Sequence, residues 1–258
     1  NDDYNETTPT WNVTHFDNIQ AGVNAVNESG IVYVCNGTYY ENVTINKKLT
    51  LMGVDEDEWG NDTDGSIIDG GENDTIFNIG ISNIKISGFI IINSERKAIN
   101  IVNSENIEIF ENTIDNNFYG IKLHNCRNIE IFENIFINNY EGVEISESGD
   151  NSIHNNSFLN NSYGASLFNN AYDNTFKEND FRNLESGISC SFSNSNSILY
   201  NNFTDCGQGV GLINSHYNTV YFNRFIDCNI GVFLGDSDYN PITWNIIQGG
   251  SIIENVTG

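Results

Sequence analysis

The sequence predicts an all-β fold, a right-handed parallel β-helix with about 22 residues per coil and a short capping helix at its N-terminal end. Two observations predict this fold. A repeat of 22 or 23 residues runs through most of the chain, and apolar residues inside each repeat are spaced by two. A spacing of two is the period of β-strands, and a fixed period of this length indicates a solenoid with one coil per repeat. Gly, Asn, Asp and Ser separate the strand-like pieces, and these residue types favour corners.

A row of asparagines marks the repeat most clearly. A large apolar residue lies three positions before each member and another two positions after it, as Ile131 and Phe136 do around Asn134. Buried amides need hydrogen-bond partners, so we expect a structural ladder along the solenoid axis rather than a catalytic row. Its members are Asn112, Asn134, Asn156, Asn179, Asn201, Asn223 and Asn245.

A second position of the repeat is also expected to face inward. It holds Asn117, Asn139 and Asn161 in early coils, and Cys206 and Cys228 in late ones. We interpret the two cysteines as a space-filling column of thiols. A disulfide between them is the alternative, although adjacent parallel strands give indifferent geometry for that bond.

The elements follow in order along one domain, residues 1–258. Residues 17–30 predict a capping helix, because apolar residues gather on one side of it and Gly30 ends it. Residues 31–81 predict the first coils, with an acidic loop at 55–66. Residues 82–248 predict the regular coils, and residues 249–258 a terminal strand.

The first coils also carry a resemblance. The stretches are Asn36-Gly37-Thr38-Tyr39, Leu49-Thr50-Leu51-Met52-Gly53 and Ile67-Ile68-Asp69-Gly70-Gly71. Together with the repeats behind them, they resemble the pectate-lyase-like β-helix proteins, and most closely the β-helix repeats of archaeal cell-surface proteins. The resemblance implies the β-helix fold. It does not imply one activity, because that superfamily includes lyases, hydrolases, epimerases, adhesins and inert surface proteins.

Charge limits the partners. The chain carries a formal net charge of −25 with only 10 Lys and Arg residues, so nucleic acid is excluded as a partner. No apolar stretch is long enough to be a transmembrane segment. The chain starts at Asn1 without a Met, which indicates either a mature exported chain or an excised fragment.

Asn-x-Ser/Thr sequons are abundant, and several lie in expected loops. They favour an extracellular, cell-surface glycoprotein. The alternative is that the sequons are unused. The candidate glycosylation sites are Asn5, Asn12, Asn27, Asn36, Asn42, Asn61, Asn73, Asn155, Asn160, Asn202 and Asn255.

The acidic loop is the best metal candidate. Asp55, Asp57, Asp62 and Asp64 supply carboxylate oxygens at the density that suits calcium. A plain acidic surface loop is the alternative. We expect no other cofactor, since no ligand set for copper or zinc is visible of the kind suggested for the nitrous-oxide-reductase accessory β-helix family.

No catalytic residue is predicted. The motifs typical of polygalacturonase-like hydrolases are absent apart from a terminal Asp pair, and the basic residues are scattered. Carboxylates such as Glu108 and Glu130 stack one coil apart, which is compatible with acid–base chemistry but also with a solvated face. No outward row that joins an acid, a base and a cation is identified.

Aromatic residues gather in the last coils. They are Tyr200, Tyr221, Phe222, Trp244, Tyr217 and Tyr239. If they point outward they form an apolar strip, which predicts either an interface or a sugar-contacting surface. The alternative is that they pack on their own neighbours at the corners.

These observations favour a structural, non-catalytic, self-assembling cell-surface glycoprotein, such as a sheath, S-layer or filament subunit. Its copies would associate head-to-tail or laterally. The alternative is a carbohydrate-binding or polysaccharide-degrading β-helix protein, of the lyase, hydrolase or epimerase kind, or a glycan-binding adhesin.

Overall fold

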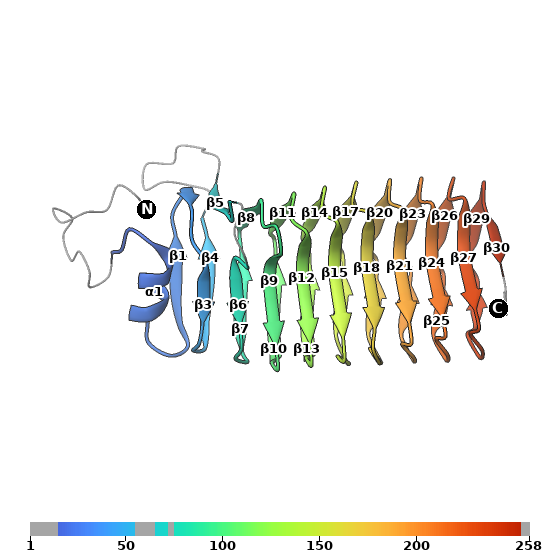
Figure 1. Cartoon of the computed structure of the whole chain (residues 1–258), viewed down its shortest axis with the longest axis horizontal. Coiled ribbons are helices and arrows are strands. Elements are labelled where there is room, and N and C mark those ends of the chain that lie inside the picture. The colour runs from blue at the N-terminus through green and yellow to red at the C-terminus, as the bar shows by residue number, and fades with distance from the viewer. Residues whose placement is uncertain (1–14, 55–64, 72–74, 254–258) are drawn as a thin grey trace.

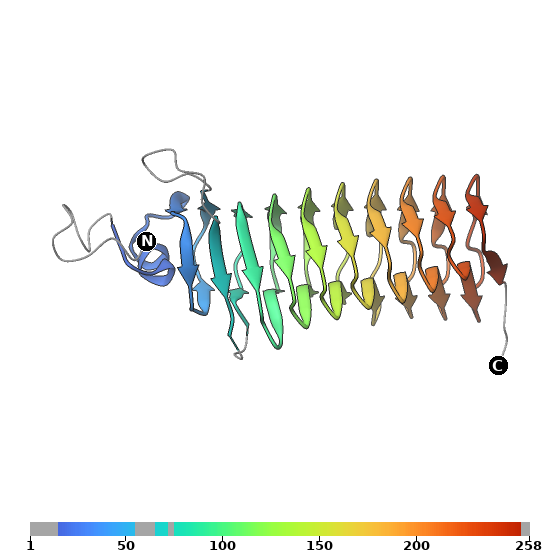
Figure 2. The same cartoon turned by 90° about the horizontal axis from the view of Figure 1, so that it is seen from above.

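A computed structural model of the chain describes residues 15–54, 65–71 and 75–253. It confirms the predicted fold. The described strands form three parallel sheets of ten strands each, and every strand pairs with the strand three positions further along the chain. The coils stack into a long, straight prism, with the helix at one end (Figures 1 and 2).

The strands of the three sheets have these bounds. The first sheet contains β1 (Gly30–Val34), β4 (Leu49–Gly53), β7 (Ile84–Ser87), β10 (Glu105–Phe110), β13 (Arg127–Phe132), β16 (Ser152–His154), β19 (Thr175–Lys177), β22 (Ser197–Leu199), β25 (Thr219–Tyr221) and β28 (Ile242–Thr243). The second sheet contains β2 (Gly37–Tyr39), β5 (Ser66–Asp69), β8 (Phe89–Ile92), β11 (Thr113–Asp115), β14 (Ile135–Ile137), β17 (Ser157–Leu159), β20 (Asp180–Arg182), β23 (Asn202–Thr204), β26 (Arg224–Ile226) and β29 (Ile246–Gln248). The third sheet contains β3 (Val43–Ile45), β6 (Phe77–Ile79), β9 (Lys97–Val102), β12 (Tyr119–His124), β15 (Glu141–Ser146), β18 (Tyr163–Phe168), β21 (Ser186–Ser191), β24 (Gln208–Ile213), β27 (Ile230–Gly235) and β30 (Ser251–Ile253).

The helix α1 (Ile19–Ala25) lies within the predicted range of 17–30 but is shorter. It begins where Asn18 accepts a hydrogen bond from the Ala21 N–H, and it ends where Val26 turns to extended backbone. The Glu41 carboxylate also accepts hydrogen bonds from the Ile19 and Gln20 N–H groups, at 2.7 and 3.0 Å. A side chain from the first coil thus holds the N-terminus of the helix, where a negative charge is favourable.

The interior is a column of apolar side chains beside a column of amides. Five phenylalanine rings stack at centroid distances of 4.6 to 4.9 Å, namely Phe136, Phe158, Phe181, Phe203 and Phe225. One glycine in each of these coils makes room for them, because a Cβ on Gly142 would lie only 2.7 Å from the Phe158 ring. These glycines form the glycine row, Gly120, Gly142, Gly164, Gly187, Gly209 and Gly231.

The predicted asparagine ladder is confirmed. Asn179 is representative of it. Its Oδ1 accepts hydrogen bonds from the backbone N–H and the Nδ2 of Asn156, both at 3.0 Å. Its own Nδ2 donates to the Ile153 carbonyl at 2.8 Å and to Asn201 Oδ1 at 3.0 Å. Each amide therefore joins its coil to both neighbouring coils.

The second inward position is confirmed as well. Asn117, Asn139 and Asn161 form a shorter ladder, and Cys206 and Cys228 lie buried as free thiols that donate to backbone carbonyls. The hydrogen bond with the neighbouring Cys228 thiol, followed by burial, raises the pKa of Cys206.

A third ladder was not predicted, although its members recur with the repeat. They are Asn151, Asn174, Asn196, Asn218 and Asn240.

Candidate functional site

The aromatic residues singled out from the sequence lie at corners of the last coils. Tyr200, Phe222 and Trp244 occupy one corner position, with φ angles of 56°, 56° and 59°. The Tyr200 and Phe222 rings stack at 5.1 Å, and the Trp244 ring lies 6.1 Å from Phe222. All three side chains are exposed, Trp244 to 72%. Bulky side chains are uncommon in the left-handed backbone region, which costs energy for them.

A second aromatic column lies at the opposite end of the same first-sheet strands. Tyr217 and Tyr239 stack at 5.1 Å with nearly parallel rings, and Tyr239 is 73% exposed. Tyr221 is half-buried and meets Phe222 edge-on at 4.1 Å. In rings that stack along the axis, the faces contact one another and the edges point to solvent. Their role as an interface or a sugar contact stays a prediction.

Some of the predicted calcium and glycosylation residues lie within the described residues, and others lie outside them. Asp55, Asp57, Asp62 and Asp64 lie outside the described residues, as do the sequons at Asn5, Asn12, Asn61, Asn73 and Asn255. Among the described sequons, four asparagines are exposed and two are half-buried. The exposed ones are Asn27, Asn42, Asn155 and Asn160, and the half-buried ones are Asn36 and Asn202. Asn202 also donates to Asp180 Oδ1 at 3.0 Å.

No three His, Cys, Asp or Glu side chains within 15–54, 65–71 and 75–253 come together as metal ligands. No helix within these ranges is long and apolar enough to cross a bilayer.

A different cluster lies on the outer face of the third sheet, which faces the viewer in Figure 1. In β15, Val143 and Ile145 belong to the core. Because side chains alternate between the faces of a strand, Glu144 points outward. Pairing places Lys122 and Ser166 beside Glu144 on the neighbouring strands. The same pairing sets Glu141 between Tyr119 and Tyr163. These two rows bring two acids, a cation and two tyrosines together, a grouping that the sequence analysis did not identify.

Glu141 is the most perturbed carboxyl group of the cluster. Its side chain is only 7% exposed, and its Oε1 is buried without a hydrogen-bond partner. Burial raises its pKa from 4.5 to about 7; Ser166 opposes this shift, nearby Glu144 adds to it, and Lys122 opposes it. Removing a carboxylate from water favours its neutral form. Glu141 is therefore protonated over much of the range below neutral pH.

Glu144 has a different environment although it is only 3% exposed. The Lys122 Nζ lies 2.5 Å from its Oε1, an ion pair that lacks the angles of a hydrogen bond. The Lys122 Nζ also lies 4.9 Å from the centre of the Tyr119 ring. Burial, followed by the charges of Glu144 and Glu141, raises the pKa of the Tyr119 hydroxyl. The cluster thus holds one carboxyl group with a raised pKa beside a second one that is ion-paired with Lys122, and two carboxyl groups in different environments are what acid–base chemistry needs.

The signal for this cluster was present in the sequence. Lys122 and Glu144 both follow the glycine row by two positions, and Tyr119 and Glu141 both precede it by one. These alignments become visible when the residues beside the glycine row are compared from coil to coil.

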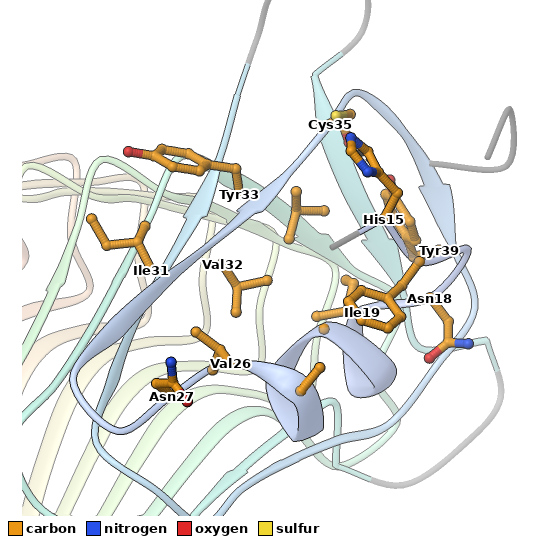
Figure 3. A pocket seen from close by; sticks show the side chains of 14 residues that line it. His15, Asn18, Ile19, Val26, Asn27, Ile31, Val32, Tyr33, Cys35 and Tyr39 are labelled. Carbon is orange, nitrogen blue, oxygen red and sulfur yellow. Dashed lines mark hydrogen bonds between the residues drawn. The ribbon is translucent and has the colours of Figure 1, made fainter. Parts of the chain in front are cut away.

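A cavity of about 500 Å³ lies at the other end of the molecule, between α1 and β1 (Figure 3). Its walls are mostly apolar, with Ile19, Val26 and Val32 among them, and His15 and Cys35 also line it. We assign no site to this cavity.

Comparisons with known proteins agree with the fold. No curated protein matches the chain. A model described as "Periplasmic copper-binding protein (NosD)" matches residues 139–257, and this similarity is compatible with a periplasmic or extracellular location. Among the described residues of that stretch, no three His, Cys, Asp or Glu side chains come together as ligands for a metal ion.

Solved structures with this fold include enzymes that act on carbohydrates. An alginate lyase from Paenibacillus sp. str. FPU-7 has a TM-score of 0.61 at 10% identity, with 92% of this chain and 96% of that one covered. DFA-IIIase from Arthrobacter chlorophenolicus A6 has a TM-score of 0.61 at 13% identity, with 88% and 76% covered. At such identities the likeness shows the fold alone.

A viral protein, ORF18 of Geobacillus virus E2, has a TM-score of 0.60 at 14% identity. The match covers 95% of this chain but only 59% of that protein, so the chain spans well under two thirds of its length. The model described as "Right handed beta helix region" matches residues 8–158, which is more than half of the sequence. The chain therefore belongs to the right-handed β-helix family.

Proposed function

We propose that this protein binds a glycan along the outer face of the third sheet and cleaves it at Glu141 and Glu144. The observation that carries the proposal is the pair of buried carboxyl groups with different environments, one with its pKa raised to about 7 by burial and one paired with Lys122. The fold shared with carbohydrate-active enzymes supports it, and so does the similarity to a periplasmic family.

Glu141 would act as the general acid. It would donate its proton to the glycosidic oxygen as the bond to the sugar carbon breaks, and the departing sugar would leave with a hydroxyl group. A water molecule would supply the new oxygen on that carbon and restore the lost proton, so that one water is consumed per bond. Glu144, held by Lys122, would be the charged carboxylate that assists the water or stabilises the cationic sugar.

The test is the release of reducing ends from a panel of polysaccharides. Glu141→Gln keeps the shape of the side chain but removes the acidic proton that a general acid transfers, so we expect a rate loss of about 10²- to 10⁴-fold. Glu144→Gln should lose activity as well. Glu108→Gln is the matched control, because Glu108 lies on the outer face of the first sheet in an exposed pair with Lys85. The proposal fails if the panel is neither bound nor cleaved, or if Glu141→Gln cleaves as fast as the wild type.

A second function is proposed from a separate observation, the exposed aromatic columns at left-handed corners. They support self-association, lateral or head-to-tail, as in a sheath, S-layer or filament. Electron microscopy and sedimentation of the native protein at high concentration test it. We expect ordered assemblies for the wild type and their loss in Tyr217→Ser/Tyr239→Ser. Monomers throughout, or assemblies that survive both substitutions, would contradict it.

A further inference from the structure

The outer face of the third sheet is asymmetric about the carboxyl pair. On its N-terminal side, the pairing of β9, β12 and β15 aligns Lys97 with Tyr119 and Glu141, and Asn100 with Lys122 and Glu144. On its C-terminal side, β18, β21 and β24 present only uncharged side chains. These outward residues are Tyr163, Ser166, Phe168, Ser186, Ser189, Ser191, Gln208, Gly211 and Ile213.

The uncharged side carries groups suited to sugar hydroxyls. Ser186 follows Glu141 and Tyr163 in the same row, and its Oγ is buried without a hydrogen-bond partner, as is Glu141 Oε1. A buried polar group without a hydrogen-bond partner destabilises the fold, and a bound sugar hydroxyl group can supply the missing partner. Tyr163 and Phe168 add half-buried aromatic surface on the strand between them.

Gln208 extends this row by one more coil, and Gly211 extends the neighbouring row of Glu144 and Ser166. A Cβ built on Gly211 would lie 2.0 Å from the Gln208 Nε2, so the Gln208 amide lies directly over the glycine. An amide offers both donors and an acceptor, which matches a hydroxyl group in either role. The glycine therefore leaves room for a polar group in line with Glu141.

The charges on the outer face of β15, β18, β21 and β24 exclude a polyanionic substrate. A uronate chain would bring one carboxylate about every 5 Å, close to the ~4.8 Å spacing of coils. It would meet Glu141 and Glu144, while Lys122 is already paired at 2.5 Å. No cation among the outward residues of β18, β21 and β24 opposes it, and the chain as a whole carries a net charge of −25. Like charges raise the free energy of such a complex.

We infer that the substrate of this site is an uncharged linear glycan that extends from Glu141 over β18, β21 and β24. The inference rests on the function proposed above. It adds the charge class of the substrate and the side of the carboxyl pair on which the chain lies.

Calorimetric titration of the Glu141→Gln protein tests the inference, because this variant keeps the hydrogen-bonding shape of the site without turnover. The probes are neutral hexasaccharides of glucose, mannose, xylose and galactose, and anionic hexasaccharides of galacturonate, mannuronate and guluronate. We expect at least one neutral probe to bind at least tenfold more tightly than every anionic probe at moderate salt.

A second variant locates the bound chain. Gly211→Ala in the same background displaces the Gln208 amide, and we expect a loss of affinity of fivefold or more. Gly80→Ala is the matched control, since nothing lies within 4 Å of its added Cβ, and its affinity should stay unchanged. Thermal unfolding verifies that both variants fold, and Gln208→Ala replaces Gly211→Ala if the latter does not.

Each outcome separates the two levels of the proposal. Preferred binding of a uronate would overturn the uncharged class and leave a glycan site in place. Neutral binding that Gly211→Ala and Gln208→Ala leave intact would overturn the placement over β24. Binding of no probe, together with no cleavage by the wild type, would remove the proposed function itself.

Discussion

Two regions of this molecule bury polar side chains, and they treat them in opposite ways. In the interior, the amide of Asn179 makes four hydrogen bonds of 2.8 to 3.0 Å to the coils on both sides. On the outer face of the third sheet, Glu141 Oε1 and Ser186 Oγ are buried and make none. Polar groups in the interior have hydrogen-bond partners, since a buried polar group without a partner lowers stability. Buried polar groups that lack a hydrogen-bond partner, although this lowers stability, are therefore candidates for function.

The largest effect should come from breaking the interior pattern. Asn179→Ala removes four hydrogen bonds and leaves the Asn156 N–H and Nδ2 groups short of an acceptor. We expect the free energy of unfolding to fall by about 4 kcal/mol, because each orphaned buried group costs ~1–3 kcal/mol. Denaturant unfolding measures it. Asn46→Ala, an exposed site, is the control and should stay within about 0.5 kcal/mol of the wild type. Equal effects at the two sites would show that the ladder is not what joins the coils.

The next effect is a dependence of stability on pH that comes from Glu141. Its pKa is raised from 4.5 to about 7 in the folded chain, so the fold favours the protonated form. Its contribution is therefore most favourable below pH 4.5 and declines as the pH rises to about 7. The loss should approach about 3 kcal/mol, at ~1.4 kcal/mol per pKa unit. Comparing unfolding curves of wild type and Glu141→Gln across this range isolates it. A difference between the two that does not change with pH would mean that Glu141 has the same pKa in the folded and the unfolded chain.

The contrast between the two regions also explains what the sequence could predict. The fold depends on features that recur in every coil, such as Asn134 with its flanking Ile131 and Phe136, so one sequence displays the rule many times. The site depends on departures from the rule at single positions. The two positions of Glu141 and Glu144 hold other residue types in the neighbouring coils. They hold Tyr119 and Lys122 in the preceding coil, and Tyr163 and Ser166 in the next one.

Burial was the part that the sequence could not show. Glu144 lies on an outward-facing row, where a carboxylate is normally solvated. Here Lys122 and Tyr119 from the preceding coil contact it. A comparison of the residues beside the glycine row would have aligned Lys122 with Glu144, but not the degree of burial. The aromatic corners show the opposite case, because Tyr217 and Tyr239 were found from the repeat while their role depends on a partner outside the chain.

The Lys122–Glu144 pair tests whether the site costs stability. Lys122→Met leaves the Glu144 charge buried without a counter-ion, and we expect a loss of about 2 kcal/mol. This is less than for a fully buried pair because the Lys122 side chain is 25% exposed. Lys122→Met/Glu144→Gln should recover much of that loss, since no unpaired charge remains. If the double variant is no more stable than the single one, Lys122 stabilises the fold through packing on Tyr119 rather than through its charge.

The smallest effect should come from the matched pair on the first sheet. Lys85 Nζ lies 2.7 Å from Glu108 Oε2, a distance close to that of the Lys122 pair, but the two side chains are 49% and 35% exposed. Water screens such a pair, so Lys85→Met should change the free energy of unfolding by less than about 0.5 kcal/mol. Salt should remove what remains of the difference. A loss as large as that of Lys122→Met would mean that the difference in exposure does not make the two ion pairs differ in strength. The missing hydrogen-bond partners of Glu141 and Ser186 would then be no sign of a site.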